Sequence, residues 1–129
     1  MHGLGEHCHR YDRMVRFLTG AGFRVYAFDQ RGHGRTHRLP PQARTGTPLV
    51  QGHHGHIHSD ARAVLDDIAL LVRRADDEGV ARAVPRFLLG HSLGGLFVTQ
   101  YALTRDVSAL AGLVLIGKQA RGGGVCGCH

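Results

Sequence analysis

The sequence predicts a domain of the α/β class, in which a mostly parallel sheet is flanked by helices. Two observations lead to this class. Apolar residues recur at helical spacing in three segments, and short runs rich in aliphatic, β-branched or aromatic residues alternate with those segments. Strands that are separated by helices favour parallel pairing. The 129 residues, of which 43% are hydrophobic, suffice for one domain with its own core.

The first predicted elements are a helix over residues 10–19 and a strand over residues 23–29. The helix has one apolar stripe at i, i+3, i+4 and i+7, formed by Tyr11, Met14, Val15 and Leu18. Gly20 and Gly22 then end it. The segment "FRVYAFD" that follows is typical of a strand. Residues 36–58 carry prolines, glycines and histidines without periodicity, which predicts a long connection.

Helical and strand patterns alternate again in the second half of the chain. Ser59 is a good N-cap for a helix that Gly79 ends, and residues 86–89 form an apolar run typical of a strand. A helix is expected to follow from Leu93, and residues 110–117 are the third candidate strand. Residues 118–129 show neither helical nor strand periodicity of apolar residues, which predicts an unstructured tail.

The net charge of +6 raises the possibility of a nucleic-acid partner, but the charge distribution argues against it. Arginines are scattered along the chain, and no aromatic residues are interleaved with them as a base-stacking surface requires. We therefore expect no nucleic-acid partner, although a basic surface could favour peripheral contact with an anionic membrane. No apolar run is long enough to span a membrane, and no secretory signal is recognisable, so a cytoplasmic and possibly membrane-associated protein is expected. The three cysteines are expected to be free thiols.

Residues 90–94, "GHSLG", carry the strongest chemical signal. The motif G-x-S-x-G has catalytic meaning when a strand leads in and a helix leads out, because the serine then sits on a strained turn that exposes its hydroxyl. Both flanks are present around Ser92. The other interpretation, a glycine-rich turn of a nucleotide-binding domain, fits less well, since the order of residues matches neither G-x-G-x-x-G nor a phosphate-binding loop with its lysine.

Two further motifs stand in register with this one. They are "HGLGEH" at residues 2–7, which precedes a helix, and "AFDQRGHGRT" at residues 27–36. With "FLLGHSLGG" at residues 87–95, they make the chain resemble the α/β-hydrolases, specifically the monoacylglycerol lipase-like branch of serine hydrolases. The resemblance covers residues 1 to about 117.

The resemblance implies roles for individual residues. Ser92 is similar to the family's nucleophile, and the backbone amides of Leu4 and Leu93 resemble its oxyanion hole. Asp29, Arg31 and His33 match a loop for which structural hydrogen bonding is expected. The implied activity is hydrolysis of a carboxylic ester, such as a monoacylglycerol or a related lipid, through an acyl-enzyme, with neither a cofactor nor a metal.

The sequence also departs from the family pattern. The acid and histidine of the family's triad follow later strands, and downstream of Ser92 only Asp106 and His129 could be nominated. Neither is expected to be catalytic, and the adjacent His91 is expected to pack. The strand before the "HG" loop would precede Met1, which implies an incomplete sheet. We therefore expect residues 1–117 to be the N-terminal part of an α/β-hydrolase domain, and the chain to be a fragment without the triad's acid and histidine.

Two alternatives from other classes stay open. A hydrolase-like module without the acid and histidine could bind a lipid or a partner without turnover. The second alternative is a metal-binding protein, since imidazoles suit transition metals and four histidines cluster in the long connection: His53, His54, His56 and His58. Because nothing in their spacing holds them on one face, we expect them not to converge. The acyl-chain preference and the oligomeric state are not predicted.

Overall fold

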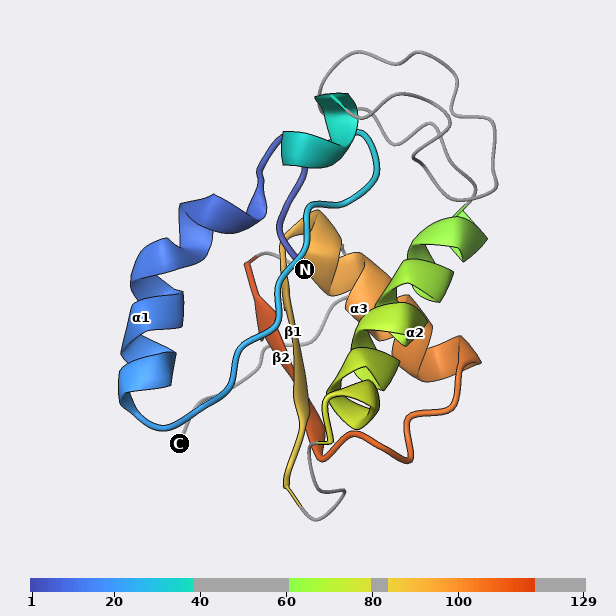
Figure 1. Ribbon diagram of the computed structural model, residues 1–129. Coiled ribbons are helices and arrows are strands. Elements are labelled where there is room, and N and C mark those ends of the chain that lie inside the picture. The colour runs from blue at the N-terminus through green and yellow to red at the C-terminus, as the bar shows by residue number, and fades with distance from the viewer. Residues whose placement is uncertain (39–60, 80–83, 118–129) are drawn as a thin grey trace.

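The computed structural model describes residues 1–38, 61–79 and 84–117 (Figure 1). A short 3-10 helix, η1 (Cys8–Tyr11), leads into α1 (Asp12–Gly20), and a second one, η2 (Gly34–Arg38), follows. The remaining elements are α2 (Ala61–Asp77), β1 (Phe87–His91), α3 (Leu93–Thr104) and β2 (Gly112–Ile116). The alternation of helix and strand confirms the predicted α/β class.

The two strands pair in parallel through the α3 crossover. Their register runs from Phe87 opposite Gly112 to His91 opposite Ile116. Met1 continues the hydrogen-bonding pattern on the other side of β1: its amino group donates to the Leu89 carbonyl (2.6 Å), and its carbonyl accepts from the His91 amide (3.0 Å). This is the bonding of a parallel ladder. The residue before the "HG" loop is thereby fixed beside the end of β1.

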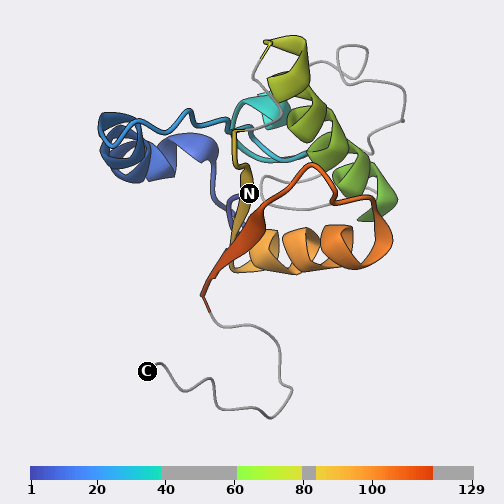
Figure 2. The ribbon, with the colours of Figure 1, turned by 90° about the horizontal axis from the view of Figure 1, so that it is seen from below.

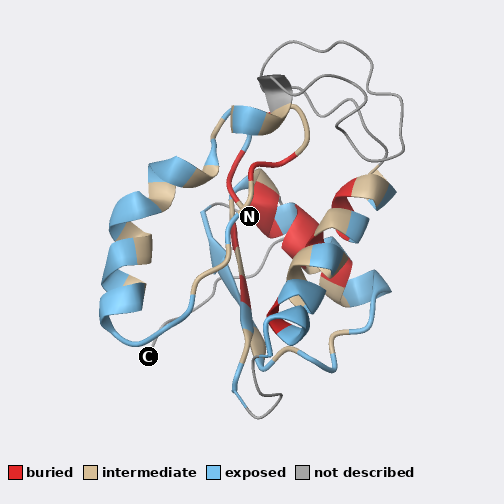
Figure 3. Cartoon of the chain, viewed as in Figure 1, coloured by how far each residue is buried: buried red, intermediate tan, exposed pale blue. Residues whose placement is uncertain are grey.

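The core lies between α2, α3 and one face of the sheet. Its buried members come from these three elements: Val64, Leu65, Ile68, Leu88, Phe97, Val98 and Tyr101. Helix α1 lies on the other side of the sheet and buries none of its residues (Figures 2 and 3). Side chains of β2 stay exposed, at 39–43% for Leu113 through Ile116. None of the described helices combines the length and apolar character needed to cross a membrane.

The strand predicted over residues 23–29 is wrong for this structure. Phe23 to Gln30 is assigned neither helix nor strand, although the chain passes close to β1 in Figure 1. The composition of the segment suits a strand, but a strand also needs a hydrogen-bonded neighbour. Among the described residues, the ladder pairs join only β1 and β2.

Three predictions lie wholly or mostly outside the described residues. They concern the tail at 118–129, the long connection from residue 39 onward, and the histidines at positions 53, 54, 56 and 58. The division of the chain at residue 117 therefore stays a prediction.

Candidate active site

Ser92 occupies the turn between β1 and α3, as the sequence predicts. Its backbone has φ 50° and ψ −118°, and it is the one non-glycine residue with positive φ in the described part of the chain. Such a conformation costs on the order of 1–3 kcal/mol and persists only when the surrounding structure enforces it. The residue is exposed, and its side chain makes no capping hydrogen bond to α3. The strained, exposed serine has the geometry of a nucleophile elbow.

The two glycines of the motif allow backbone segments to pass close to this turn. A Cβ atom on Gly90 would lie 2.6 Å from the carbonyl oxygen of Gly94, and one on Gly94 would lie 2.5 Å from the carbonyl oxygens of Met1 and His2. Real side chains do not tolerate such contacts. Gly90 therefore admits the first turn of α3 against β1, and Gly94 admits the N-terminal segment against α3.

The "HG" loop is anchored through buried His2. Its Nε2 accepts a hydrogen bond from the Gln30 amide (2.9 Å), so the ring proton lies on Nδ1, which donates to the Gly3 carbonyl (2.9 Å). The Gln30 side-chain amide also donates to the His2 carbonyl. Burial lowers the pKa of His2 and thus favours the neutral ring that this hydrogen bonding requires.

The loop brings Gly3 against the serine turn. A Cβ atom on Gly3 would lie 3.3 Å from Ser92 Cβ, 3.2 Å from His91 Nδ1 and 3.0 Å from Glu6 Oε2. Leu4, the next residue, is 61% exposed. Leu93 begins α3, where the first amides of a helix have no partner within the helix. The two residues named for the oxyanion hole thus adjoin the contact between Gly3 and Ser92.

Asp29, Arg31 and His33 make the structural hydrogen bonds expected of them. Asp29 accepts from the amides of Cys8 and Arg35, at 2.8 Å each, and thereby joins η1 to η2. Burial alone would raise the pKa of Asp29, but these two hydrogen bonds, together with the Cys8 thiol and the nearby His2, lower the pKa to about 2. Arg31 forms a two-point ion pair with Asp67 on α2 (2.6 and 2.8 Å). His33 contacts the Arg31 carbonyl through Nδ1 (3.0 Å).

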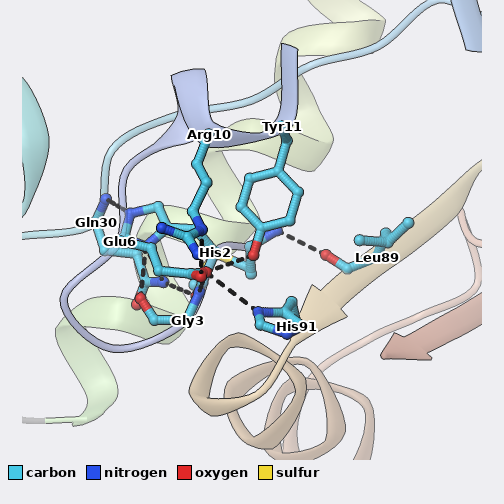
Figure 4. Close-up of polar contacts among 9 residues, drawn as sticks. His2, Gly3, Glu6, Arg10, Tyr11, Gln30, Leu89 and His91 are labelled. Carbon is cyan, nitrogen blue, oxygen red and sulfur yellow. Dashed lines mark hydrogen bonds and ion pairs between the residues drawn. The ribbon is translucent and has the colours of Figure 1, made fainter. Parts of the chain in front are cut away.

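Glu6 is the residue whose role the sequence does not reveal. Its Oε2 accepts from the Gly3 amide (2.8 Å), from the Tyr11 hydroxyl (2.5 Å) and from His91 Nδ1 (3.1 Å), as Figure 4 shows. Its Oε1 lies 3.0 Å from Arg10 Nε. Burial alone would raise the pKa of Glu6, but the hydrogen bonds from Tyr11, Gly3 and His91, together with the charge interaction with His91, lower the pKa to about 2. In the sequence, the role of this residue is indicated only by a glutamate three positions after Gly3.

The residues considered as partners for Ser92 lie elsewhere or are engaged. Asp106 lies beyond the far end of α3, on the order of 18 Å along the helix axis from Ser92, and it accepts a hydrogen bond from the Ser108 amide. His91 bonds to Glu6 through Nδ1, and within the described part of the chain its Nε2 makes no hydrogen bond to the Ser92 hydroxyl. His129 lies outside the described residues. Within residues 1–38, 61–79 and 84–117, no group of three or more His, Cys, Asp or Glu side chains could hold a metal ion.

Comparisons with known proteins agree with this geometry. The sequence model of the family described as serine aminopeptidase S33 matches residues 1–122. An uncharacterised abhydrolase domain-containing protein of Dictyostelium discoideum is 34% identical over 115 residues, which make up 89% of this chain and 10% of that protein. Monoglyceride lipases of mouse and human are 34% and 35% identical over 115 residues, again 89% of this chain but 32% of each lipase. The chain thus spans about a third of the length of these two lipases. No solved structure matches it significantly.

Proposed function

The chain belongs to the serine aminopeptidase S33 family of α/β-hydrolases, and from this premise we propose that it carries the nucleophile of a serine hydrolase that cleaves carboxylic esters. Monoacylglycerols or related lipid esters are the proposed substrates, in keeping with the monoglyceride lipases among its relatives. The observation that carries the proposal is the strained, exposed backbone of Ser92 between β1 and α3.

The proposed chemistry is acyl transfer to the Ser92 hydroxyl. Its Oγ attacks the ester carbonyl while its proton passes to a base, and the carbonyl oxygen becomes an oxyanion. The amides of Leu4 and Leu93 are proposed to donate to this oxyanion, assisted by the N-terminal end of α3. The tetrahedral intermediate then expels the alcohol, which takes up the proton. Water hydrolyses the acyl-serine by the same steps and releases the carboxylic acid.

The base for this reaction is not assigned to a described residue. Among the described residues, His91 makes no hydrogen bond to the Ser92 hydroxyl through Nε2, and Asp106 lies at the far end of α3. The same observation favours a second candidate function, a module that binds a lipid or an ester without turnover. The two functions differ in the reactivity of Ser92.

Labelling with a fluorophosphonate tests the proposal. We expect the reagent to modify Ser92 alone, slowly, and faster when imidazole is added as an external base. Intact mass and peptide mapping would measure the site and extent of modification. Ser92→Ala should abolish it, whereas Ser108→Ala, at an exposed serine after α3, should leave it unchanged. Equal modification of Ser108, or none of Ser92 with imidazole present, would contradict the proposal.

A further inference from the structure

The carboxylate of Glu6 joins three parts of the site through a single oxygen. Oε2 receives hydrogen bonds from the "HG" loop (Gly3), from η1 (Tyr11) and from the last residue of β1 (His91), as Figure 4 shows. The side chain is 15% exposed, so little water competes for these bonds. We propose that Glu6 is a positioning residue of the active site, which holds the Gly3–Leu4 peptide at a fixed place relative to Ser92.

The turn around Leu4 supports this role. The Glu6 amide donates to the Gly3 carbonyl (3.3 Å) while the Glu6 carboxylate accepts from the Gly3 amide, so the two residues bond reciprocally. Gly5 has φ +70°, which suits the third position of a four-residue turn from Gly3 to Glu6. Leu4 lies at the second position of this turn, where its amide is not needed for the turn's own bonds. Together with His2, whose Nδ1 donates to the Gly3 carbonyl, Glu6 therefore sets the orientation of the Leu4 amide.

The other end of the network fixes the serine turn. His91 immediately precedes Ser92, and its ring is held both by Glu6 and by an edge contact with the Tyr11 ring at 5.9 Å between centroids. Each of the two peptides proposed to bind the oxyanion thus lies within two residues of a group bonded to Glu6. A shift of the carboxylate would displace both.

The charge of Glu6 also needs an explanation, because an anion near an oxyanion opposes the reaction. Its negative charge is offset by the guanidinium of Arg10 and spread over three further donors. A glutamine with its one acceptor oxygen in the place of Oε2 would turn its amide nitrogen, which only donates, toward the Arg10 guanidinium. The donor set explains the choice of glutamate over glutamine.

Glu6→Gln tests the inference, with Glu78→Gln as a matched control. Glu78 also accepts from a tyrosine hydroxyl and an arginine, Tyr26 and Arg74, but it lies just past the C-terminal end of α2. Two measurements are made on the full chain. The first is hydrogen exchange of the Gly3 and Leu4 amides by NMR, which does not depend on the proposed function. The second is the fluorophosphonate modification of Ser92, from which a binding constant and a maximal rate are obtained. This second measurement rests on the proposed function.

We expect Glu6→Gln to speed exchange of the Gly3 amide at least tenfold. The maximal rate of Ser92 modification should fall by about tenfold or more, since loss of one oxyanion donor costs about a hundredfold or more, while the binding constant stays within threefold. Glu78→Gln should change neither quantity. If Glu6→Gln lowers only thermal stability and leaves loop exchange at the wild-type value, the inference is wrong.

Two outcomes would leave only part of this experiment usable: an unreactive wild-type Ser92, and a Glu6→Gln variant that does not fold. Should wild-type Ser92 resist modification even with imidazole, the proposed function fails, and loop exchange alone judges the role of Glu6. Should Glu6→Gln fail to fold, Tyr11→Phe removes one donor and keeps the carboxylate. It is expected to change loop exchange in the same direction by a smaller amount, and an unchanged exchange rate would overturn the inference.

Discussion

At the scale of single residues, the glycines around Ser92 decide whether the turn can form. Gly90→Ala would place a Cβ atom 2.6 Å from the Gly94 carbonyl oxygen and force the first turn of α3 away from β1. We expect a loss of about 1–3 kcal/mol in the free energy of unfolding and loss of Ser92 modification. Urea unfolding measures the first effect.

Gly20→Ala is the control for this substitution. Nothing lies within 4 Å of a Cβ atom at Gly20, the last residue of α1, so alanine should be neutral or stabilise by up to about 1 kcal/mol. Equal destabilisation by the two substitutions would mean that the close packing at Gly90 does not matter.

The pKa values of Glu6 and Asp29 predict acid sensitivity. Each pKa falls to about 2 in the folded chain, from ordinary values of 4.5 and 3.8. Between the folded pKa of about 2 and these ordinary values, the unfolded chain binds more protons than the folded chain does. The free energy of unfolding therefore rises with pH over this range. The contribution of both carboxylates is complete above about pH 5 and is lost as the pH falls toward 2. Urea unfolding at pH 5, 4 and 3 checks this, and Glu6→Gln should flatten the pH dependence.

The order of residues in the sequence predicts the position of Ser92 in a turn, but it does not predict the contacts of Glu6. The G-x-S-x-G motif places its serine through local geometry alone, and the observed strand, turn and helix agree with it. The contacts of Glu6 with His91 join residues 85 apart in the chain. Such a contact depends on how the loop folds over β1, and no local pattern encodes it.

At the scale of elements, an ion pair between Arg31 and Asp67 attaches the loop at residues 31–34, "RGHG", to α2. Arg31 and Asp67 bond at two points, with side chains 15% and 18% exposed. We expect Asp67→Asn to cost about 2 kcal/mol, in the range for hydrogen bonds to charged groups. Denaturant unfolding monitored by circular dichroism measures the loss.

The neighbouring Asp66 provides the comparison. It pairs with Arg105 at 2.7 Å, but the two side chains are 61% and 38% exposed. A pair so open to water contributes little, so Asp66→Asn should cost less than about 1 kcal/mol. A loss as large as that of Asp67→Asn would refute the distinction drawn here between buried and exposed pairs.

The elements themselves show what sequence patterns can predict. Residues 86–89, the helix from Leu93 and residues 110–117 are found within two residues of their expected bounds, because periodicity and turn residues act locally. The strand expected at residues 23–29 fails because aromatic and β-branched composition cannot provide a hydrogen-bonded neighbour.

At the scale of the whole molecule, the N-terminal loop, the end of β1 and the start of α3 meet at one place. Met1 bonds to β1, Gly94 lies against the carbonyls of Met1 and His2, and Gly3 lies against Ser92. Segments about 90 residues apart in sequence thus build the site together. This assembly is proposed to provide a nucleophile and oxyanion donors, while no described side chain forms a hydrogen bond with the Ser92 hydroxyl.

Hydrolysis of a short p-nitrophenyl ester by the purified chain tests this proposal. It is measured with and without imidazole, and beside Ser92→Ala. Without a base, losing triad function costs up to about a million-fold in turnover, so we expect a Ser92-dependent rate far below about 1 per second, the low end of ordinary enzymes. Imidazole should raise the Ser92-dependent rate. A Ser92-dependent rate of about 1 per second without imidazole, or none with imidazole, would contradict the proposal.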